Sequence, residues 1–225
     1  MPAGQPHKVV IEYFALGEAR SSALQFLCHH AGIVYEFKGH SFESWGAEKA
    51  AGRGGEFGGL PRVHIDKHEL GESQAILRCM GAKHGYYNPN DPKQSYLVDV
   101  VLDCFGDLHD TSNGVALGVV TGQMTAEDGN KAIAEKIPKV FEPILNLYEA
   151  QLGHGCKFIA GEKVTIADCA MVALMANILE NPNGPFFETY KPLMTKYPKI
   201  SAYFGRLRIE FAKRLNDPNR AKAPV

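Results

Sequence analysis

The chain has 225 residues, of which 45% are hydrophobic and 22% charged, and 24 basic against 25 acidic residues leave a net charge of -1. This composition indicates a soluble globular protein of one large or two modest domains. It excludes the basic excess typical of nucleic-acid binding and the polybasic patch of a membrane-surface protein, and no apolar stretch reaches the ~18 residues of a membrane span.

The first part of the chain alternates between short strands and helices. The expected strands are, in chain order, residues 9–14, 34–37, 62–66 and 69–70. Helical spacing of apolar residues predicts a helix from Leu24 to Ala31, which Gly32 ends as a C-cap, and a further helix that begins near Ala75. A β-α-β start followed by a β-hairpin and a helix predicts a small α/β domain of thioredoxin-like plan.

A linker is predicted at YYNPNDP, residues 86–92, because three breakers fall within five residues. Beyond it the apolar residues recur at helical spacing, as in Ile133 to Tyr148. We therefore predict an α/β domain over residues 1–87 and an all-helical domain over residues 88–225.

Within the helical part, Thr165 and Asp168 form an S/T-x-x-D capping signature ahead of the apolar run from Ala170 to Leu179. This pattern predicts that Asp168 is a buried structural acid at the start of a helix.

The glycine-rich stretch GRGGEFGGLP, residues 52–61, does not fit a phosphate-binding loop, because its glycines precede a strand and no Lys-Ser or Lys-Thr follows. Pro61 cannot donate to a sheet ladder, and a cis bond would turn the N–H and C=O of Leu60 outward, where a peptide could pair with them. Glu72 and Ser73 stand at the next helix start, where free N–H groups attract a carboxylate. The segment suits a short anionic peptide better than a nucleotide.

The cysteines and histidines give no sign of a disulfide framework or a metal site. The five cysteines are scattered and never spaced as CxxC, which favours reduced thiols. His29 and His30 are adjacent on a helix and point apart, while His64 and His68 lack ligand partners at suitable spacing. The N-terminus lacks signal- and transit-peptide patterns, so we expect a cytoplasmic protein.

Several stretches in family order resemble cytosolic glutathione transferases of the tyrosine type, and the sigma and pi classes most of all. The segment GLPRVHIDKHELGESQAILRCMG is similar to their LP…(E/Q)S-x-AI segment, and IEYFALGEAR to their first strand and loop. SFESWGAEK resembles their Trp-x-x-x-Lys segment, and LVDVVLDCFGDL the first helix of their second domain. FIAGEKVTIAD resembles their N-capping box and ISAYFGRL the helix beyond it. The resemblance spans almost the whole chain.

The resemblance implies that Tyr13 is the catalytic tyrosine, whose hydroxyl stabilises the glutathione thiolate. A count back from Gly32 without gaps places Phe14 at this position instead, so the assignment to Tyr13 requires one extra residue in the following loop. Without the resemblance, the residue pattern alone favours a strand tyrosine packed in the core at Tyr13.

The other implied roles concern glutathione and a second subunit. Arg20 is expected to bind the glutamyl end or to cap the helix. Trp45 and Lys49 are expected to contact the glycyl carboxylate, or else to be a packing tryptophan and a solvated lysine. Asp103 matches the aspartate that reaches across the dimer to the partner's ligand, or is one of several exposed acids on its helix.

The resemblance implies further roles for the glycine-rich region. Glu72 and Ser73 should hold the γ-glutamyl end, and Leu60, fixed by Pro61, should pair with the ligand backbone. The chain between Lys49 and Pro61 is longer than in relatives, so the glycine-rich residues 52–59 are expected to be a local insertion.

The implied protein is a homodimeric detoxification enzyme, a glutathione S-transferase with glutathione as co-substrate and no tightly bound cofactor. It would join the thiolate to small hydrophobic electrophiles in an apolar pocket. The expected pocket wall is Leu16, Phe105, Leu108 and Phe211. Two alternatives stay open: a non-catalytic ligand-binding or crystallin-like protein of the same fold, and a glutathione-dependent prostaglandin isomerase.

Overall fold

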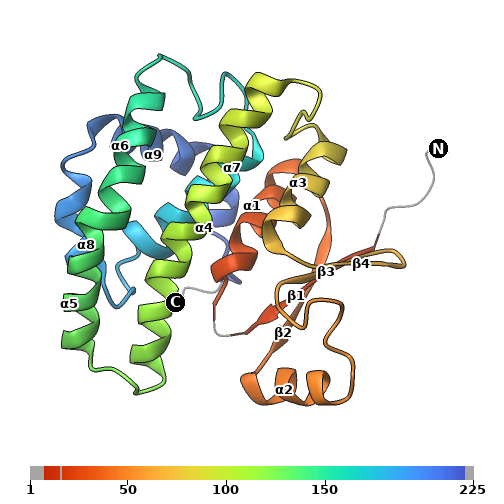
Figure 1. Cartoon of the computed structure of the whole chain (residues 1–225). Coiled ribbons are helices and arrows are strands. Elements are labelled where there is room, and N and C mark those ends of the chain that lie inside the picture. Colours follow the sequence, from red (N-terminus) through yellow and green to blue (C-terminus); the bar gives the residue numbers. More distant parts are fainter. Residues whose placement is uncertain (1–7, 16, 221–225) are drawn as a thin grey trace.

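The computed structural model describes residues 8–15 and 17–220, and Figure 1 shows how their elements are arranged. In chain order the elements are β1 (Val9–Phe14), η1 (Ala19–Ser21), α1 (Ser22–Ala31), β2 (Tyr35–His40), α2 (Phe42–Ala50), β3 (Arg62–Ile65), β4 (His68–Leu70), α3 (Ser73–His84), α4 (Pro92–Val120), α5 (Ala126–Lys136), η2 (Ile137–Phe141), α6 (Glu142–Leu152), α7 (Ile166–Leu174), η3 (Met175–Leu179), α8 (Phe187–Met194), α9 (Pro198–Glu210) and α10 (Ala212–Leu215). The element η1 is a 3-10 helix, whereas η2 and η3 are π-helical.

The four strands form one mixed sheet in the order β2-β1-β3-β4. The central strand β1 runs parallel to β2 and antiparallel to β3, which makes a hairpin with β4. Side chains alternate between the two faces of a strand, so Val9, Ile11 and Tyr13 share the face that packs on the helices. Glu12 points to the other face, where Trp45 of α2 covers its partner Arg62.

The predicted thioredoxin-like plan followed by an all-helical part is confirmed, with two local differences (Figure 1). The second strand covers 35–40 rather than 34–37, and the pattern did not predict α2. Trp45 is the single buried residue of α2, so this helix shows no apolar period in the sequence. Its start is instead marked by a capping box between Ser41 and Ser44.

The helical part is built around α7, whose nine residues are all buried. This helix packs against α1, α4 and α9 and so joins the sheet domain to the helices. Asp168 is fully buried, closes a capping box with Thr165 and accepts a hydrogen bond from the Tyr203 hydroxyl at 2.6 Å. The prediction that Asp168 is structural is confirmed. Among the helices described, none is long and apolar enough to cross a membrane.

Candidate active site

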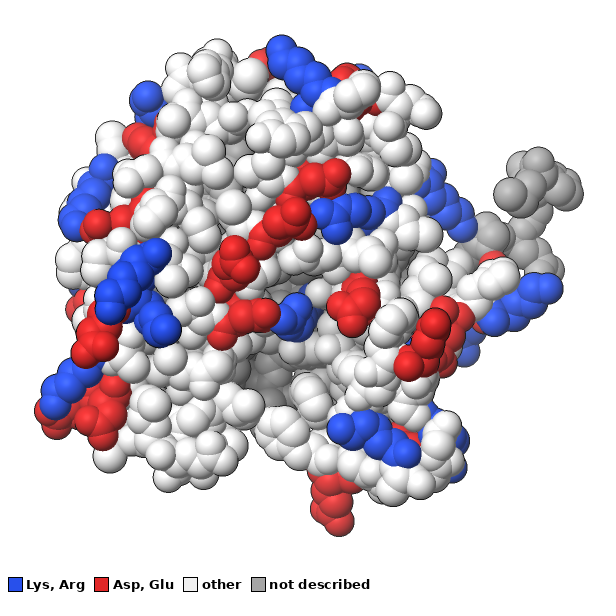
Figure 2. All heavy atoms as spheres, in the orientation of Figure 1, with Lys and Arg blue, Asp and Glu red and all other residues white. Residues whose placement is uncertain are grey.

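Two cavities are lined by neighbouring residues of the segment that joins β1 to α1. The first, the polar cavity, has a volume of about 200 Å³ and is lined by Arg20, Phe57, Gly59, Leu60, Pro61, Glu72 and Ser73. The second, the apolar cavity, has about 150 Å³ and is lined by Tyr13, Phe14, Gly17, Ala19, Phe42, Asn113, Leu117 and Val120. In Figure 2 the surface is hollowed between the ends of α4 and α2, and acidic and basic side chains are interspersed around the hollow.

The polar cavity brings together five of the residues that the sequence analysis selected: Arg20, Leu60, Pro61, Glu72 and Ser73. The Leu60–Pro61 peptide bond is cis, as predicted. Within the part of the chain that the structure describes, the backbone of Leu60 has no hydrogen-bond partner. An extended ligand can therefore pair with Leu60 without displacing a bond of the protein.

Glu72 has an unusual backbone conformation at the start of α3. Its φ of 64° and ψ of 101° are rarely adopted by residues other than glycine, at a cost of about 1–3 kcal/mol. Such strain persists where the surrounding structure holds it, and it clusters at ligand sites. Ser73 follows as the first residue of a 12-residue helix, so first-turn N–H groups lie beside the cavity and favour an anion there.

Arg20 connects the polar cavity to both domains. Its guanidinium forms an ion pair with Asp110 of α4, and its backbone N–H donates to the Tyr13 hydroxyl at 3.4 Å. The polar cavity and the tyrosine are thus linked through one residue.

Tyr13 lies at the end of β1 with 8% of its surface exposed. Burial raises the pKa of the Tyr13 hydroxyl above its ordinary value of 10, against a smaller lowering by the hydrogen bond from Arg20, so the group stays protonated at neutral pH. Because the oxygen accepts from Arg20, the hydroxyl proton is left to donate to an anion. Phe14 lines the same cavity, and its ring meets that of Tyr13 edge-on at 5.6 Å.

Three other selected residues line neither cavity. Trp45 is 5% exposed, and its ring lies 5.4 Å from both the Arg62 guanidinium and the His40 ring. Lys49 is exposed on α2. Asp103 is exposed on α4 and pairs with Arg78 at 3.0 Å.

The expected pocket wall is wrong for three of its four residues. Phe105, Leu108 and Phe211 are buried in the core and line no part of the apolar cavity, because they lie where α4 and the C-terminal segment pack inward. Leu16 lies outside the described residues.

The residues that do form the wall on α4 are Asn113, Leu117 and Val120. Their i, i+4, i+7 spacing is the signal that could have identified them as one face of the helix.

The sequence analysis also missed Phe57, which the glycine-rich residues 52–59 bring to the polar cavity. Its ring covers Gly71 so closely that a Cβ there would lie 2.4 Å from Phe57 Cδ2. Glycine is therefore needed at position 71 for this close approach.

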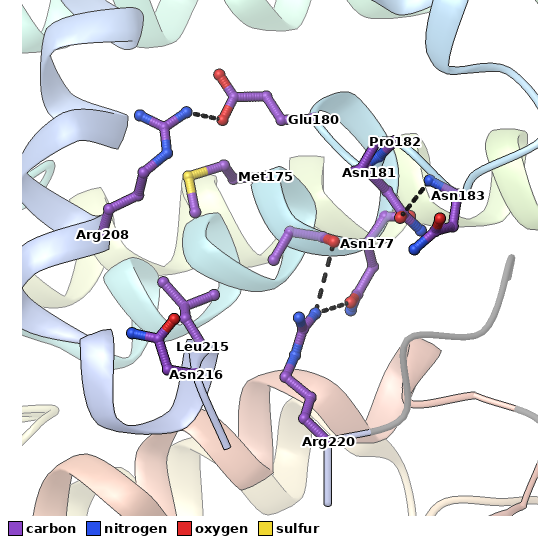
Figure 3. Close-up of a pocket in the computed structure, with 11 residues that line it drawn as sticks. Met175, Asn177, Glu180, Asn181, Pro182, Asn183, Arg208, Leu215, Asn216 and Arg220 are labelled. Atoms are coloured by element: carbon purple, nitrogen blue, oxygen red, sulfur yellow. Dashed lines mark hydrogen bonds and ion pairs between the residues drawn. The ribbon is translucent and has the colours of Figure 1, made fainter. Parts of the chain in front are cut away.

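A third cavity, of about 510 Å³, lies between η3 and the C-terminal segment (Figure 3). It shares no lining residue with the other two. Its charged groups are already engaged, since Arg208 pairs with Glu180 and Arg220 donates to Asn177 Oδ1 at 2.6 Å. Among residues 8–15 and 17–220, no group of three or more His, Cys, Asp or Glu is placed to hold a metal ion.

Comparison with known proteins gives a consistent result. Residues 72–208 match the family model of the glutathione S-transferase C-terminal domain. The chain is 36% identical over 208 residues to the probable glutathione S-transferase 6 of Caenorhabditis elegans. This match covers 92% of this chain and 96% of that protein. It is 25% identical over 222 residues to glutathione S-transferase P 1 of Xenopus laevis, and this match covers 96% of this chain and 95% of that protein.

The likeness extends to solved structures. Monomeric Na-GST-3, a glutathione S-transferase from the hookworm Necator americanus, matches with a TM-score of 0.78 at 21% identity, over 94% of this chain and 97% of that one. The structure of NaGST-2 matches with a TM-score of 0.79 at 22% identity, over 96% and 99%. At these identities the structural match establishes the fold.

Proposed function

Because the chain belongs to the glutathione S-transferase family, we propose that it joins the thiolate of glutathione to small hydrophobic electrophiles. One observation carries the proposal: Tyr13, whose hydroxyl is protonated, lines the apolar cavity, and this hydroxyl accepts a hydrogen bond from the backbone N–H of Arg20, which lines the polar cavity. A peptide thiol in the polar cavity and an electrophile in the apolar cavity would then meet at Tyr13.

In this proposal the polar cavity holds the γ-glutamyl end of glutathione. The α-carboxylate lies at the start of α3 against Ser73 and near the Arg20 guanidinium, while the ammonium group faces Glu72. The cysteinyl backbone pairs with Leu60, whose peptide groups are unpartnered among the described residues. The sulfur then points toward Tyr13.

The remaining selected residues have proposed roles at the edges of this site. Lys49 is the cation that α2 offers to the glycyl carboxylate, and the packing of Trp45 on Arg62 holds α2 against the sheet. Asp103 would bind the ammonium group of glutathione in a second subunit. Its carboxylate would then contact both that ammonium group and Arg78.

The chemistry follows from the ionisation of the thiol. Only the thiolate is a good nucleophile, and a hydrogen bond from a fixed hydroxyl stabilises that anion relative to the thiol. An apolar electrophile leaves water when it binds in the apolar cavity, which then holds it close to the sulfur.

The variant Tyr13→Phe tests the proposal. The thiolate absorbance of bound glutathione, followed against pH, should show a higher thiol pKa in the variant than in the wild type. Turnover should fall roughly a hundredfold, as when one donor to an anion is removed, while glutathione affinity stays within about twofold. The control is Tyr35→Phe, which removes a half-buried hydroxyl bound to Gln25 and should leave the thiol pKa unchanged.

Coincident titrations of wild type and Tyr13→Phe would show that another group activates the sulfur. Glutathione binding without turnover of any electrophile would instead favour the non-catalytic alternative.

A further inference from the structure

A buried ion cluster joins the segment between β1 and α1 to the C-terminal end of the described chain. Its centre is Glu18, which is 3% exposed and lines neither the polar nor the apolar cavity. The Glu18 carboxylate accepts from Arg214 of α10 through Oε1, and from Arg220 Nε through Oε2 at 3.2 Å. Glu18 and Arg214 are 196 positions apart in the sequence, so this carboxylate connects the start of the chain to its end.

Each of the two arginines is itself held by further contacts. Arg214 is 4% exposed and also donates to Gln25 Oε1 of α1 at 2.6 Å. Arg220 also donates to Asn177 Oδ1 of η3 at 2.6 Å (Figure 3). The Glu18 carboxylate therefore meets two guanidinium groups whose own positions are set by α1 and η3.

The residues on either side of Glu18 belong to the candidate active site. Gly17 and Ala19 line the apolar cavity, and the backbone N–H of Arg20 donates to the Tyr13 hydroxyl at 3.4 Å. Ala19 has a φ of 25°, a backbone conformation that residues other than glycine rarely adopt. Such a conformation persists only where the surrounding structure holds it, and the anchored Glu18 is the residue directly before it.

Stability alone does not account for charged groups in this place. A buried ion pair gives little net stability, because the loss of hydration offsets the attraction between the charges. Apolar side chains of similar volume would hold the same segments together equally well. The two guanidinium groups add direction, because hydrogen bonds to both carboxylate oxygens fix the orientation of Glu18 and of the backbone that follows it.

We propose that Glu18 is a positioning residue for the thiolate reaction, because its two ion pairs hold the Arg20 N–H against the Tyr13 hydroxyl. The inference rests on the proposed glutathione transferase function. The bond from Arg20 occupies a lone pair of the Tyr13 oxygen, which leaves the hydroxyl proton for the sulfur. Hydrogen bonds in a chain strengthen one another where water is excluded, so the same bond makes the hydroxyl a better donor.

The test measures the thiol pKa of bound glutathione in Glu18→Gln, from the thiolate absorbance followed against pH. This variant keeps the size of the side chain and removes its charge, and the thiol pKa should rise. With benzyl chloride as electrophile, kcat should fall roughly threefold to tenfold, the effect of one ordinary hydrogen bond, while KM for glutathione stays within about twofold. Glu180→Gln is the matched control, because it breaks another ion pair with a C-terminal arginine, Arg208, and should change none of these values.

A second comparison separates positioning from a general loosening of the fold. If Glu18 acts through the Tyr13 hydroxyl, Glu18→Gln should have no further effect on the thiol pKa in a Tyr13→Phe background. Equal shifts in the two backgrounds would overturn the inference. Arg220→Gln removes one of the two cations and should raise the thiol pKa by less, and it takes the place of Glu18→Gln if that variant does not fold.

The proposed function fails on a different result, which is measured without any change at Glu18. A Tyr13→Phe variant with the thiol pKa of the wild type would overturn the role of Tyr13, and with it this inference. A raised thiol pKa in Tyr13→Phe, together with an unchanged one in folded Glu18→Gln, would overturn the inference alone.

Discussion

Glu12→Gln should destabilise the folded protein by about 3–5 kcal/mol at neutral pH, because it removes a buried charge that several basic groups share. The Glu12 carboxylate is 5% exposed on the outer face of the sheet. It binds His40 Nε2 at 2.7 Å, His64 Nε2 at 2.9 Å, Arg62 Nη2 at 3.0 Å and Lys38 Nζ at 3.3 Å. Glutamine would remove the closer carboxylate partner of the buried Arg62, at 3.0 Å, and leave it the more exposed Glu69 at 3.5 Å.

The pH dependence of this effect follows from the pKa of Glu12. Burial raises that pKa, but the hydrogen bonds from His40 and Arg62 and the nearby positive charges outweigh burial and lower the pKa from 4.5 to about 2. A difference of this size corresponds to about 3 kcal/mol of folding free energy. Since the pKa is lower in the folded state, the stabilisation is complete above about pH 4.5 and is lost as the pH falls toward 2. Between about pH 6 and about pH 3.5 the loss is about 1.4 kcal/mol.

Urea unfolding of the wild type and Glu12→Gln at these two pH values measures the effect. The difference in free energy of unfolding between the wild type and Glu12→Gln should be about 1.4 kcal/mol smaller at about pH 3.5 than at about pH 6. Glu36→Gln is the matched control on β2, because its carboxylate pairs with Lys8 at 3.4 Å where both side chains are mostly exposed, and it should change stability by less than about 1 kcal/mol. A Glu12→Gln difference that is the same at both pH values would refute the reasoning.

Two further predictions concern the helical domain and the assembly. Asp168→Asn should lower the free energy of unfolding in urea by roughly 2–4 kcal/mol, because Thr165 donates to Oδ2 and Tyr203 to Oδ1, and the amide places an NH2 group against one of these two donors; an unchanged value would contradict this. Light scattering at micromolar concentration should give the mass of a dimer, since the proposed role of Asp103 requires a second subunit. A monomer mass, the state of the hookworm relative, would leave Asp103 with only its pair to Arg78.

Local signals in the sequence were enough to predict much of the fold. The β1 strand, the C-cap at Gly32 and the capping box of Asp168 each depend on neighbouring residues, and all three are present. The α2 helix was missed because Trp45 alone is buried there. The cavity wall was missed for the opposite reason: Phe105 and Leu108 are apolar, but α4 is long enough that different turns of it face the core and the cavity.

The ion pair between Arg20 and Asp110 orients neighbouring side chains more than it stabilises the folded protein. Its side chains are 35% and 56% exposed, and a pair of that exposure contributes about 0–1 kcal/mol. The domains are held together instead by buried apolar packing, chiefly of α1 against α7. The pair orients two groups at once, because Asp110 Oδ1 also lies 3.4 Å from Nδ1 of His109, whose ring contacts the Asn113 amide. A weak contact between the domains thereby connects side chains of the polar cavity to side chains of the apolar cavity. A substitution of Asp110 should therefore change the position of side chains in both cavities.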